Sequence, residues 1–413
     1  MTTKAELLEL ISHGENSGVE FKRDDVRPEQ LAKEIVAFAN FQGGQVLLGV
    51  DDDGSICGIQ RENLEHWLVD TVFSRYIHPQ IIPYYKEIRI SENQHVAVIT
   101  ISTGVTKPYV VRQRDREDIY IRVGSTSRLA TREQQARLFA SGGMLYAEKL
   151  PVSGSGLSDL SQDRLKDYLL SIVGENEVPD NSKGWHTLLS KLGFMTESET
   201  GAPPVCTIAG LILFGLSPRR LLPNAGIRWM AFAGKEKSYK SLEDRLFDEP
   251  LVPIRGSPSG VGGHILENGL LESLFMAMRP FVSEELDNLD DSLRRQRSWA
   301  YPLEALRESV INAVVHRDWT RYEEIEVVRY ADCLSVLSPG ALQNSMTVEK
   351  MIAGQRSPRN NLIVSVLRDY GYVDSRGMGV RSKIIPLLLE NNGTVPEFEA
   401  TEDYLKTVMY QRM

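Results

Sequence analysis

The run of residues 45–50, Gln-Val-Leu-Leu-Gly-Val, constrains the fold of this chain more than any other segment. It is short and almost continuously apolar, which is typical of a β-strand buried on both faces of a sheet. Such a strand needs a layer of packed elements on each side. A helical pattern precedes it, starting at Pro28 and carrying apolar side chains at Leu31, Ile35, Phe38 and Ala39. The sequence therefore predicts a mixed α/β architecture.

Strand and helix patterns alternate through the first 145 residues. Besides 45–50, strands are predicted at residues 18–22, 55–59, 95–101 and 118–123. A Ser/Gly/Pro-rich seam at residues 151–158 has the composition of a linker. We therefore predict three units, at residues 1–145, 157–290 and 291–413.

The second and third predicted units differ in pattern. Residues 157–290 suggest a connector with winged-helix-like helices at 162–173 and 185–192. They are followed by a strand-like run at 207–214, which the wider segment 207–218 allows to be either a core strand or a core helix. That connector carries no strongly basic recognition helix, so base readout is not assigned to it. Residues 291–413 suggest an α/β sandwich, with a helix at 301–316 and paired strands at 324–330 and 334–337.

The charge of the chain limits how it can bind a partner. Among 413 residues, Lys plus Arg number 47 and Asp plus Glu number 56, which gives a formal net charge of −9. This excludes a basic protein that coats DNA by bulk charge, but not a local basic groove. No apolar run approaches the ~18 residues of a membrane span. Three widely spaced cysteines suit a reducing compartment, so a cytoplasmic protein with no membrane partner is expected.

Acidic residues and one lysine gather near the first predicted strands: Glu15, Glu20, Lys22, Asp51 and Asp52. Alternate side chains of a strand share one face, so Glu20 and Lys22 point the same way. Carboxylates hold Mg²⁺ or Mn²⁺ through oxygen, the metal lowers the pKa of a bound water, and a lysine can orient that water. The group is a candidate catalytic site, with Glu15, Glu20 and Asp51 as metal ligands. The alternative is a surface ion pair beside a hairpin turn at 51–53.

The sequence around these residues resembles that of a known family. The segments 18–22, 33–40, 43–54 and 120–126 are similar in order and spacing to the Schlafen AlbA-like domain. The resemblance implies nucleic-acid binding and, in some members, a metal-dependent RNA nuclease. It places Glu15, Glu20 and Asp51 or Asp52 at the positions of the nuclease carboxylates. Other members are regulators presumed to bind DNA, so the resemblance does not by itself imply cleavage.

A local excess of positive charge supports contact with nucleic acid. Residues 107–137 hold eight basic and four acidic residues. The candidate contacts are Lys107, Arg112, Arg114, Arg116, Arg122 and Arg128, with Arg122 singled out for phosphate and with Tyr109 and Tyr120 as stacking partners for bases. The alternative is a solvated hairpin in which arginines and acids alternate.

A polar stripe runs through the predicted helix 301–316, whose other residues are mostly apolar. It consists of Glu308, Asn312 and His316 at i, i+4 and i+8. Polar groups on a buried helix need partners, and a Mg²⁺-nucleotide supplies them. Asn312 can coordinate Mg²⁺ and Glu308 can accept a proton from water. The alternative is an exposed face whose His316 compensates the charge of the helix end.

Segments around this helix resemble the GHKL-type ATP-binding module that is related to the RecG helicase C-terminus. They are residues 301–318, 337–340, 357–360 and 377–379. The resemblance implies ATP bound by Glu308 and Asn312, with Ser338, Gly340, Gly377 and Gly379 near the nucleotide. Ser338 stands where the family has its adenine-binding aspartate. The chain has no Gly-x-x-x-x-Gly-Lys-[Ser/Thr] motif, so helicase motor chemistry is not expected.

These observations support two main hypotheses and a third. The first is a Schlafen-like endoribonuclease that uses Mg²⁺ or Mn²⁺ to cleave tRNA or another structured RNA. It would be gated by ATP-dependent assembly of a homo-oligomer, and bacterial anti-phage defence is a setting that such a gate would suit. The second is a transcriptional regulator that binds DNA in response to ATP and has no nuclease activity. The third is an ATPase without nuclease activity.

Overall fold

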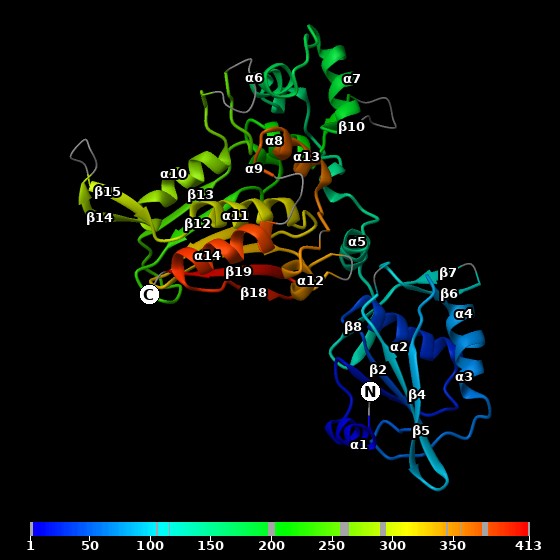
Figure 1. Cartoon of the computed structure of the whole chain (residues 1–413). Helices are drawn as coiled ribbons and strands as arrows, with labels where there is room; N and C mark the ends of the chain where they lie inside the picture. The colour runs from blue at the N-terminus through cyan, green and yellow to red at the C-terminus, as the bar shows by residue number, and fades with distance from the viewer. Residues whose placement is uncertain are drawn as a thin grey trace. The chain divides into compact units, whose positions relative to one another are not determined.

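A computed structural model describes residues 3–104, 106–114, 116–196, 203–256, 264–289, 295–343, 346–355, 357–373 and 379–411. The chain forms two compact units, Met1–Leu145 and Tyr146–Met413 (Figure 1). Both contain helices and sheets, so the mixed α/β fold class is confirmed. Within the described residues, no helix is long and apolar enough to cross a membrane.

The first unit is built on a four-stranded sheet of order β1-β2-β5-β4. Its strands are β1 (Val19–Lys22), β2 (Gly44–Leu48), β5 (Gln94–Ile101) and β4 (Tyr84–Ser91). Strand β2 pairs in parallel with β1 and antiparallel with β5. Val46 and Leu48 pack with helix α2 (Pro28–Asn40), whereas Leu47 packs in a second cluster with Leu7 and Phe21. Burial of β2 on both faces is therefore confirmed.

Smaller elements complete the first unit. They are α1 (Lys4–His13), α3 (Leu64–Trp67), η1 (Leu68–Phe73), α4 (Ser74–Tyr76), β3 (Ile77–His78), β6 (Val110–Gln113), β7 (Arg116–Asp118), β8 (Tyr120–Val123), β9 (Thr126–Leu129) and α5 (Arg132–Ser141). The strand predicted at 55–59 is wrong, because only one isolated bridge, Val50 to Ile56, forms there. The amides of Cys57 and Gly58 both donate to the Gly49 carbonyl, which bends the segment into a loop.

The second unit is built on a six-stranded sheet of order β13-β12-β16-β17-β19-β18. Its strands are β13 (Glu243–Phe247), β12 (Ile227–Ala231), β16 (Ile325–Arg329), β17 (Cys333–Pro339), β19 (Tyr404–Tyr410) and β18 (Glu397–Ala400). Strand β12 pairs in parallel with β16. Because of that pairing, the predicted segments 157–290 and 291–413 share one sheet.

One hydrophobic core joins this sheet to helices from both predicted segments. They include α8 (Ile208–Phe214), α10 (Leu270–Val282), α11 (Leu303–His316), α13 (Asn361–Asp369) and α14 (Ile385–Asn392). Helix α8 occupies the run for which the sequence allowed a core strand or a core helix. Thr207 caps it by accepting the Gly210 N–H, and every residue of the helix is buried. A short, wholly apolar run does not distinguish a buried helix from a buried strand, so the sequence left both open and the structure shows the helix.

The remaining elements of the second unit are short or peripheral. They are η2 (Ala147–Lys149), η3 (Leu157–Asp159), α6 (Gln162–Asp167), η4 (Tyr168–Val173), α7 (Ser182–Leu192), β10 (Met195–Thr196), β11 (Val205–Cys206), α9 (Pro218–Leu221), β14 (Ser283–Leu289), β15 (Arg295–Trp299), α12 (Val348–Ile352) and η5 (Val380–Ile384). Helices therefore form within both stretches for which the connector prediction required them.

Candidate functional site

The carboxylate group of the first unit surrounds Lys22 on strand β1. Alternation along the strand buries Phe21 and puts Glu20 and Lys22 on the same face. The Lys22 Nζ lies 2.6 Å from Glu20 Oε1, 3.9 Å from Glu15 Oε1 and 4.0 Å from Asp52 Oδ1. Three carboxylates from separate parts of the chain thus meet at one ammonium group.

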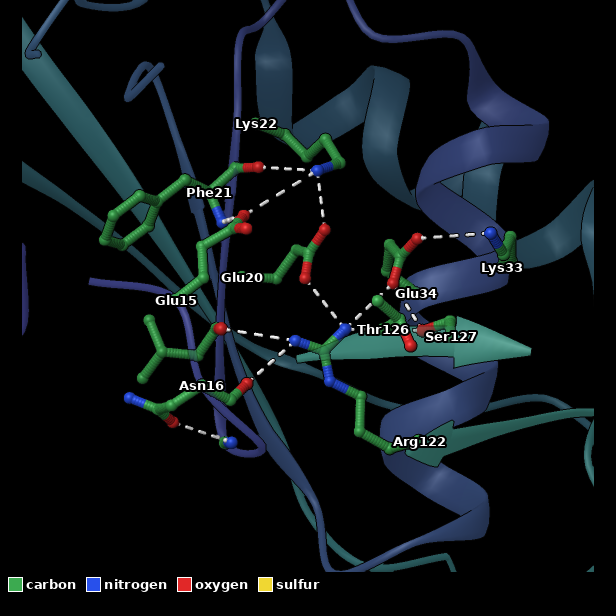
Figure 2. Close-up of polar contacts among 12 residues, drawn as sticks. Glu15, Asn16, Glu20, Phe21, Lys22, Lys33, Glu34, Arg122, Thr126 and Ser127 are labelled. Carbon is green, nitrogen blue, oxygen red and sulfur yellow. Dashed lines mark hydrogen bonds and ion pairs between the residues drawn. The ribbon is translucent and has the colours of Figure 1, made fainter. Parts of the chain in front are cut away.

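The second carboxylate oxygen of Glu20 belongs to a buried ion cluster (Figure 2). Arg122 on β8 places Nη1 at 2.7 Å from Glu20 Oε2 and 3.1 Å from Glu34 Oε2. Its Nη2 donates to the Asn16 carbonyl at 2.8 Å, and its guanidinium lies 4.6 Å from the centre of the Phe38 ring. The Arg122 side chain is 0% exposed. Arg122 therefore holds the unit together and does not reach the surface, contrary to the expectation that it contacts phosphate.

This arrangement does not fit a metal ion as it stands. Burial lowers the pKa of Lys22, but the hydrogen bond and charge of Glu20 outweigh it and raise the pKa above its usual value. The ammonium therefore stays charged between the carboxylates. Asp51 instead pairs with Arg23 at 3.2 Å. In the part of the chain that the structure describes, no three His, Cys, Asp or Glu side chains are placed to hold a metal.

The predicted nucleic-acid contacts differ in their exposure and in their partners. Arg112 pairs with Glu117 at 2.5 Å and Arg116 with Asp118 at 2.7 Å, as the solvated-hairpin alternative predicts. Lys107 donates to the Phe41 carbonyl at 2.9 Å. The side chains that stay exposed are those of Arg112, Arg114, Arg116 and Arg128.

The two tyrosines proposed to stack on bases differ in exposure. Tyr109 is buried, so its ring is not available to a base. Tyr120 is half-buried, with the Lys33 ammonium 5.7 Å from its ring centre. Tyr120 is therefore the one of these two tyrosines whose ring is partly accessible.

A second site is a cavity of about 360 Å³ within the second unit. Glu308, Asn312 and His316 line it from one face of α11, since residues four apart on a helix lie one above another. Ser338, Gly340 and Gly379 line it from other segments of the chain. Gly377 lies outside the described residues. Every described member of the predicted nucleotide set therefore borders one cavity.

Two of these residues have a specific steric or hydrogen-bonding role. A Cβ atom on Gly379 would overlap the Glu308 carboxylate, so only glycine allows this approach. The Ser338 hydroxyl donates to the Ala313 carbonyl at 2.8 Å and is buried. It therefore ties β17 to α11 and can offer a ligand only its acceptor electrons.

The cavity also has cationic lining residues that sequence reasoning did not single out. They are Arg359, Arg368, Arg381 and Lys383. Arg359 is buried and pairs with Asp318 at 2.9 Å, while its Nη2 donates to the Ala341 carbonyl at 2.7 Å. The only signal for Arg359 in the sequence was its place in the segment 357–360 that resembles the ATP-binding module.

The protonation of His316 predicts how the stability of the protein depends on pH. Burial, with a smaller contribution from the Arg359 charge, lowers the pKa of His316 to about 4. The unfolded chain binds a proton near the ordinary value of 6.5, so stability should fall as pH drops from about 6.5 to 4 and should change no further below 4. We expect about 2–3 kcal/mol of this loss to disappear in His316→Gln.

The measurement for His316 is the free energy of unfolding in urea across that pH range. The difference between wild type and His316→Gln cancels the other titrating groups. His186→Gln, which replaces a histidine on the separate helix α7, is measured beside it as the control. A wild-type profile that matches His316→Gln would show that folding does not lower the pKa of His316.

Comparisons with known proteins match two segments of the chain to protein families. Residues 15–131 match the family model described as Schlafen, AlbA_2. Residues 323–409 match the recG C-terminal model, whose description names an ATP-dependent DNA helicase. The second match begins after α11, yet Glu308 and Asn312 of that helix line the same cavity as Ser338 and Gly340 of the matched segment.

Two solved structures are similar at low identity. The DIP2311 protein from Corynebacterium diphtheriae shares 20% identity, with 100% of this chain and 77% of that chain covered and a TM-score of 0.43. The N-terminal domain of a RecG-related protein from Nitrosomonas europaea also shares 20% identity, with 32% of this chain and 95% of that chain covered and a TM-score of 0.25. Both scores are below 0.5, so neither likeness supports a conclusion.

A search of curated proteins gave no match. Each of the two family models covers less than a third of the chain. Both resemblances predicted from the sequence are confirmed, since residues 15–131 match the Schlafen AlbA_2 family and residues 323–409 match the recG C-terminal family.

Proposed function

We propose that this chain is a nucleotide-responsive nucleic-acid-binding protein. Its second unit would bind a Mg²⁺-nucleotide of the ATP type, and its first unit would bind RNA or DNA. The observation that carries the proposal is the cavity bordered by α11, by the residues after β17 and by the start of η5. Residues more than 60 positions apart in the sequence contribute to it, as the resemblance to an ATP-binding module requires.

The chemistry of the cavity suits a polyphosphate ligand. Its volume of about 360 Å³ falls within the range of small-molecule sites. Among the described residues, four basic side chains and one carboxylate, Glu308, line it. Arg359 is paired with Asp318, and the positive charge of the other three favours a polyanion. Asn312 would hold the metal side of the nucleotide, and Arg381 and Lys383 would face its phosphates. Bound Mg²⁺-ATP would supply a phosphoryl group that water can accept, with Glu308 as the proton acceptor.

Exposed arginines support nucleic-acid binding by the first unit. Arg112, Arg114 and Arg116 stand on one hairpin of a chain whose net charge is −9. Binding would therefore be confined to this local surface and would weaken with salt. An ATP-driven homo-oligomer that pairs two such hairpins on one nucleic acid remains part of this proposal.

Metal-dependent RNA cleavage is a second candidate function. One observation favours it, namely that Glu15, Glu20 and Asp52 converge on Lys22. The ammonium occupies the point between the carboxylates, so we derive no catalytic step through a metal. Activity of this kind, whether on tRNA or another RNA, and any role in anti-phage defence depend on a rearrangement of Lys22.

The hairpin prediction is tested by replacing Arg112, Arg114 and Arg116 together with alanine. We expect the affinity for a labelled tRNA or a duplex DNA to fall about 10-fold or more, because each lost phosphate contact removes a salt-dependent contribution. The slope of log Kd against log salt should decrease by roughly 2–3. Fluorescence anisotropy at several salt concentrations measures both quantities.

Matched variants and a gel assay complete this test. Substituting Lys4, Lys86 and Arg89 by alanine removes as many basic residues from elsewhere on the first unit and should have little effect on binding. Unchanged binding in the triple hairpin variant would remove the hairpin from the proposal.

The gel assay tests the second candidate function. Cleavage of RNA in the presence of Mn²⁺ that Glu15→Gln abolishes would favour the nuclease over the binding protein.

A further inference from the structure

Glu148 is a fully buried carboxylate and the third residue of the second unit. It lies in η2 and has no exposed surface. Its Oε1 accepts the Leu362 N–H at 2.9 Å and its Oε2 accepts the Ile363 N–H at 3.0 Å. The carboxylate therefore joins the start of the second unit to the first turn of α13, more than 200 residues later in the sequence.

Helix α13 needs this distant partner because its own cap is used elsewhere. The first N–H groups of a helix have no acceptor within the helix. Asn360, at the N-cap position, makes no cap hydrogen bond and instead donates to the Val315 carbonyl at 3.1 Å and the Arg317 carbonyl at 2.9 Å. Glu148 supplies the acceptor and places a carboxylate at the positive end of the helix dipole.

The same helix and the loop before it form one wall of the cavity. Ser357, Pro358 and Arg359 of the loop and Val364 and Arg368 of α13 border it. Arg359 also donates to the His316 carbonyl at the end of α11, at 3.2 Å. A ligand that shifts or orders this wall thus acts on residues directly adjacent to Leu362 and Ile363.

The segment that follows Glu148 is fixed to the body of the second unit. The Leu150 carbonyl accepts the Ile208 N–H at 3.1 Å, and the Val152 N–H donates to the Cys206 carbonyl at 2.9 Å. These bonds reach α8 and the strand before it, which do not border the cavity. In the described residues, Glu148 is therefore the side chain of this segment that bonds to α13, the helix whose Val364 and Arg368 border the cavity.

We propose that Glu148 couples occupancy of the cavity to residues 146–152, the segment that leads from the first unit into the second. This inference rests on the proposed nucleotide site and adds its route of regulation. A nucleotide that shifts α13 would also shift the Leu362 and Ile363 N–H groups, which donate to Glu148. Glu148 would then carry this shift into the connecting segment. Coupling is reciprocal, so nucleic acid bound by the first unit would alter nucleotide affinity by the same factor.

Hydrogen exchange on the full chain tests this coupling with Glu148→Gln. In wild type, a non-hydrolysable ATP analogue with Mg²⁺ should slow exchange in peptides covering 146–152 and 361–364 at least fivefold. In Glu148→Gln, the analogue should bind within about threefold of wild-type affinity. The change at 146–152 should be lost, and the analogue should alter tRNA affinity less than twofold.

Controls separate a coupling role from a structural one. Glu390→Gln, an exposed glutamate of the same unit, should behave as wild type. If Glu148→Gln does not fold, Glu148→Asp, which keeps the charge but shortens the reach, replaces it in the same comparison. A variant that loses thermal stability but keeps the full nucleotide response at 146–152 would overturn the proposal.

The outcomes also distinguish this inference from the function it rests on. If wild type binds the analogue but residues 146–152 do not respond, the coupling is wrong and the nucleotide site stands. If wild type binds no analogue at millimolar concentration, the proposed function itself fails, and the coupling fails with it.

Discussion

Arg122→Ala is expected to destabilise the first unit by about 3–5 kcal/mol, because it leaves Glu20 and Glu34 buried without their shared counter-charge. The variant also removes two donors to backbone carbonyls and the contact with the Phe38 ring. Removing one member of a buried ion cluster costs more than the cluster contributes, since Glu20 then keeps only Lys22 as a counter-charge and Glu34 only Lys33, 3.8 Å away. This makes Arg122 the most sensitive position of the unit.

Native-state hydrogen exchange of the β2 and β5 amides measures the stability of this unit in the full chain. Arg116→Ala is the matched control, because its ion pair with Asp118 has the same 2.7 Å separation but an Arg side chain that is 70% exposed. An exposed pair contributes about 0–1 kcal/mol, so this control should change little. Equal, small effects from both variants would show that the Arg122 cluster is not buried.

Asn312→Ala is expected to weaken binding of Mg²⁺-ATP by about 10–100-fold. Asn312 lies in the middle of the polar stripe of α11, between Glu308 and His316, and all three border the cavity. Loss of an oxygen that ligates a metal or bonds a charged ligand typically costs about 1.5–3 kcal/mol. Isothermal titration calorimetry with a non-hydrolysable analogue measures the change.

The matched control for this prediction is Glu304→Ala on the same helix. Glu304 is exposed and does not border the cavity. The Glu304→Ala substitution removes a carboxylate from α11 at a position away from the proposed ligand. The affinity for Mg²⁺-ATP should therefore stay within twofold. Unchanged affinity in Asn312→Ala would take Asn312 out of the site, whereas a loss in both variants would indicate damage to the helix.

Local periodicity predicted the parts of the fold that depend on local patterns. The double-sided burial of β2 followed from a continuous apolar run, and the shared face of Glu20 and Lys22 followed from strand alternation. The face of α11 that carries Glu308, Asn312 and His316 followed from helical spacing. Each of these features is set by residues close together in the sequence.

Features that depend on distant segments were not predictable in the same way. Arg122 stands among exposed arginines in the sequence, and only the placement of Glu20 and Glu34 shows that it is buried. Nothing near Glu148 indicates that its acceptor role lies at Leu362 and Ile363. The basic lining of the cavity likewise comes from loops and helices that fold back onto α11.

The central claim is that the cavity beside α11 binds a nucleotide. A crystal structure of the full chain with Mg²⁺ and a non-hydrolysable ATP analogue tests it most directly. We predict electron density for the analogue in contact with Asn312 and Glu308, and with its phosphates towards Arg381 and Lys383. Analogue bound elsewhere, or a cavity without density at a saturating concentration, would contradict the claim.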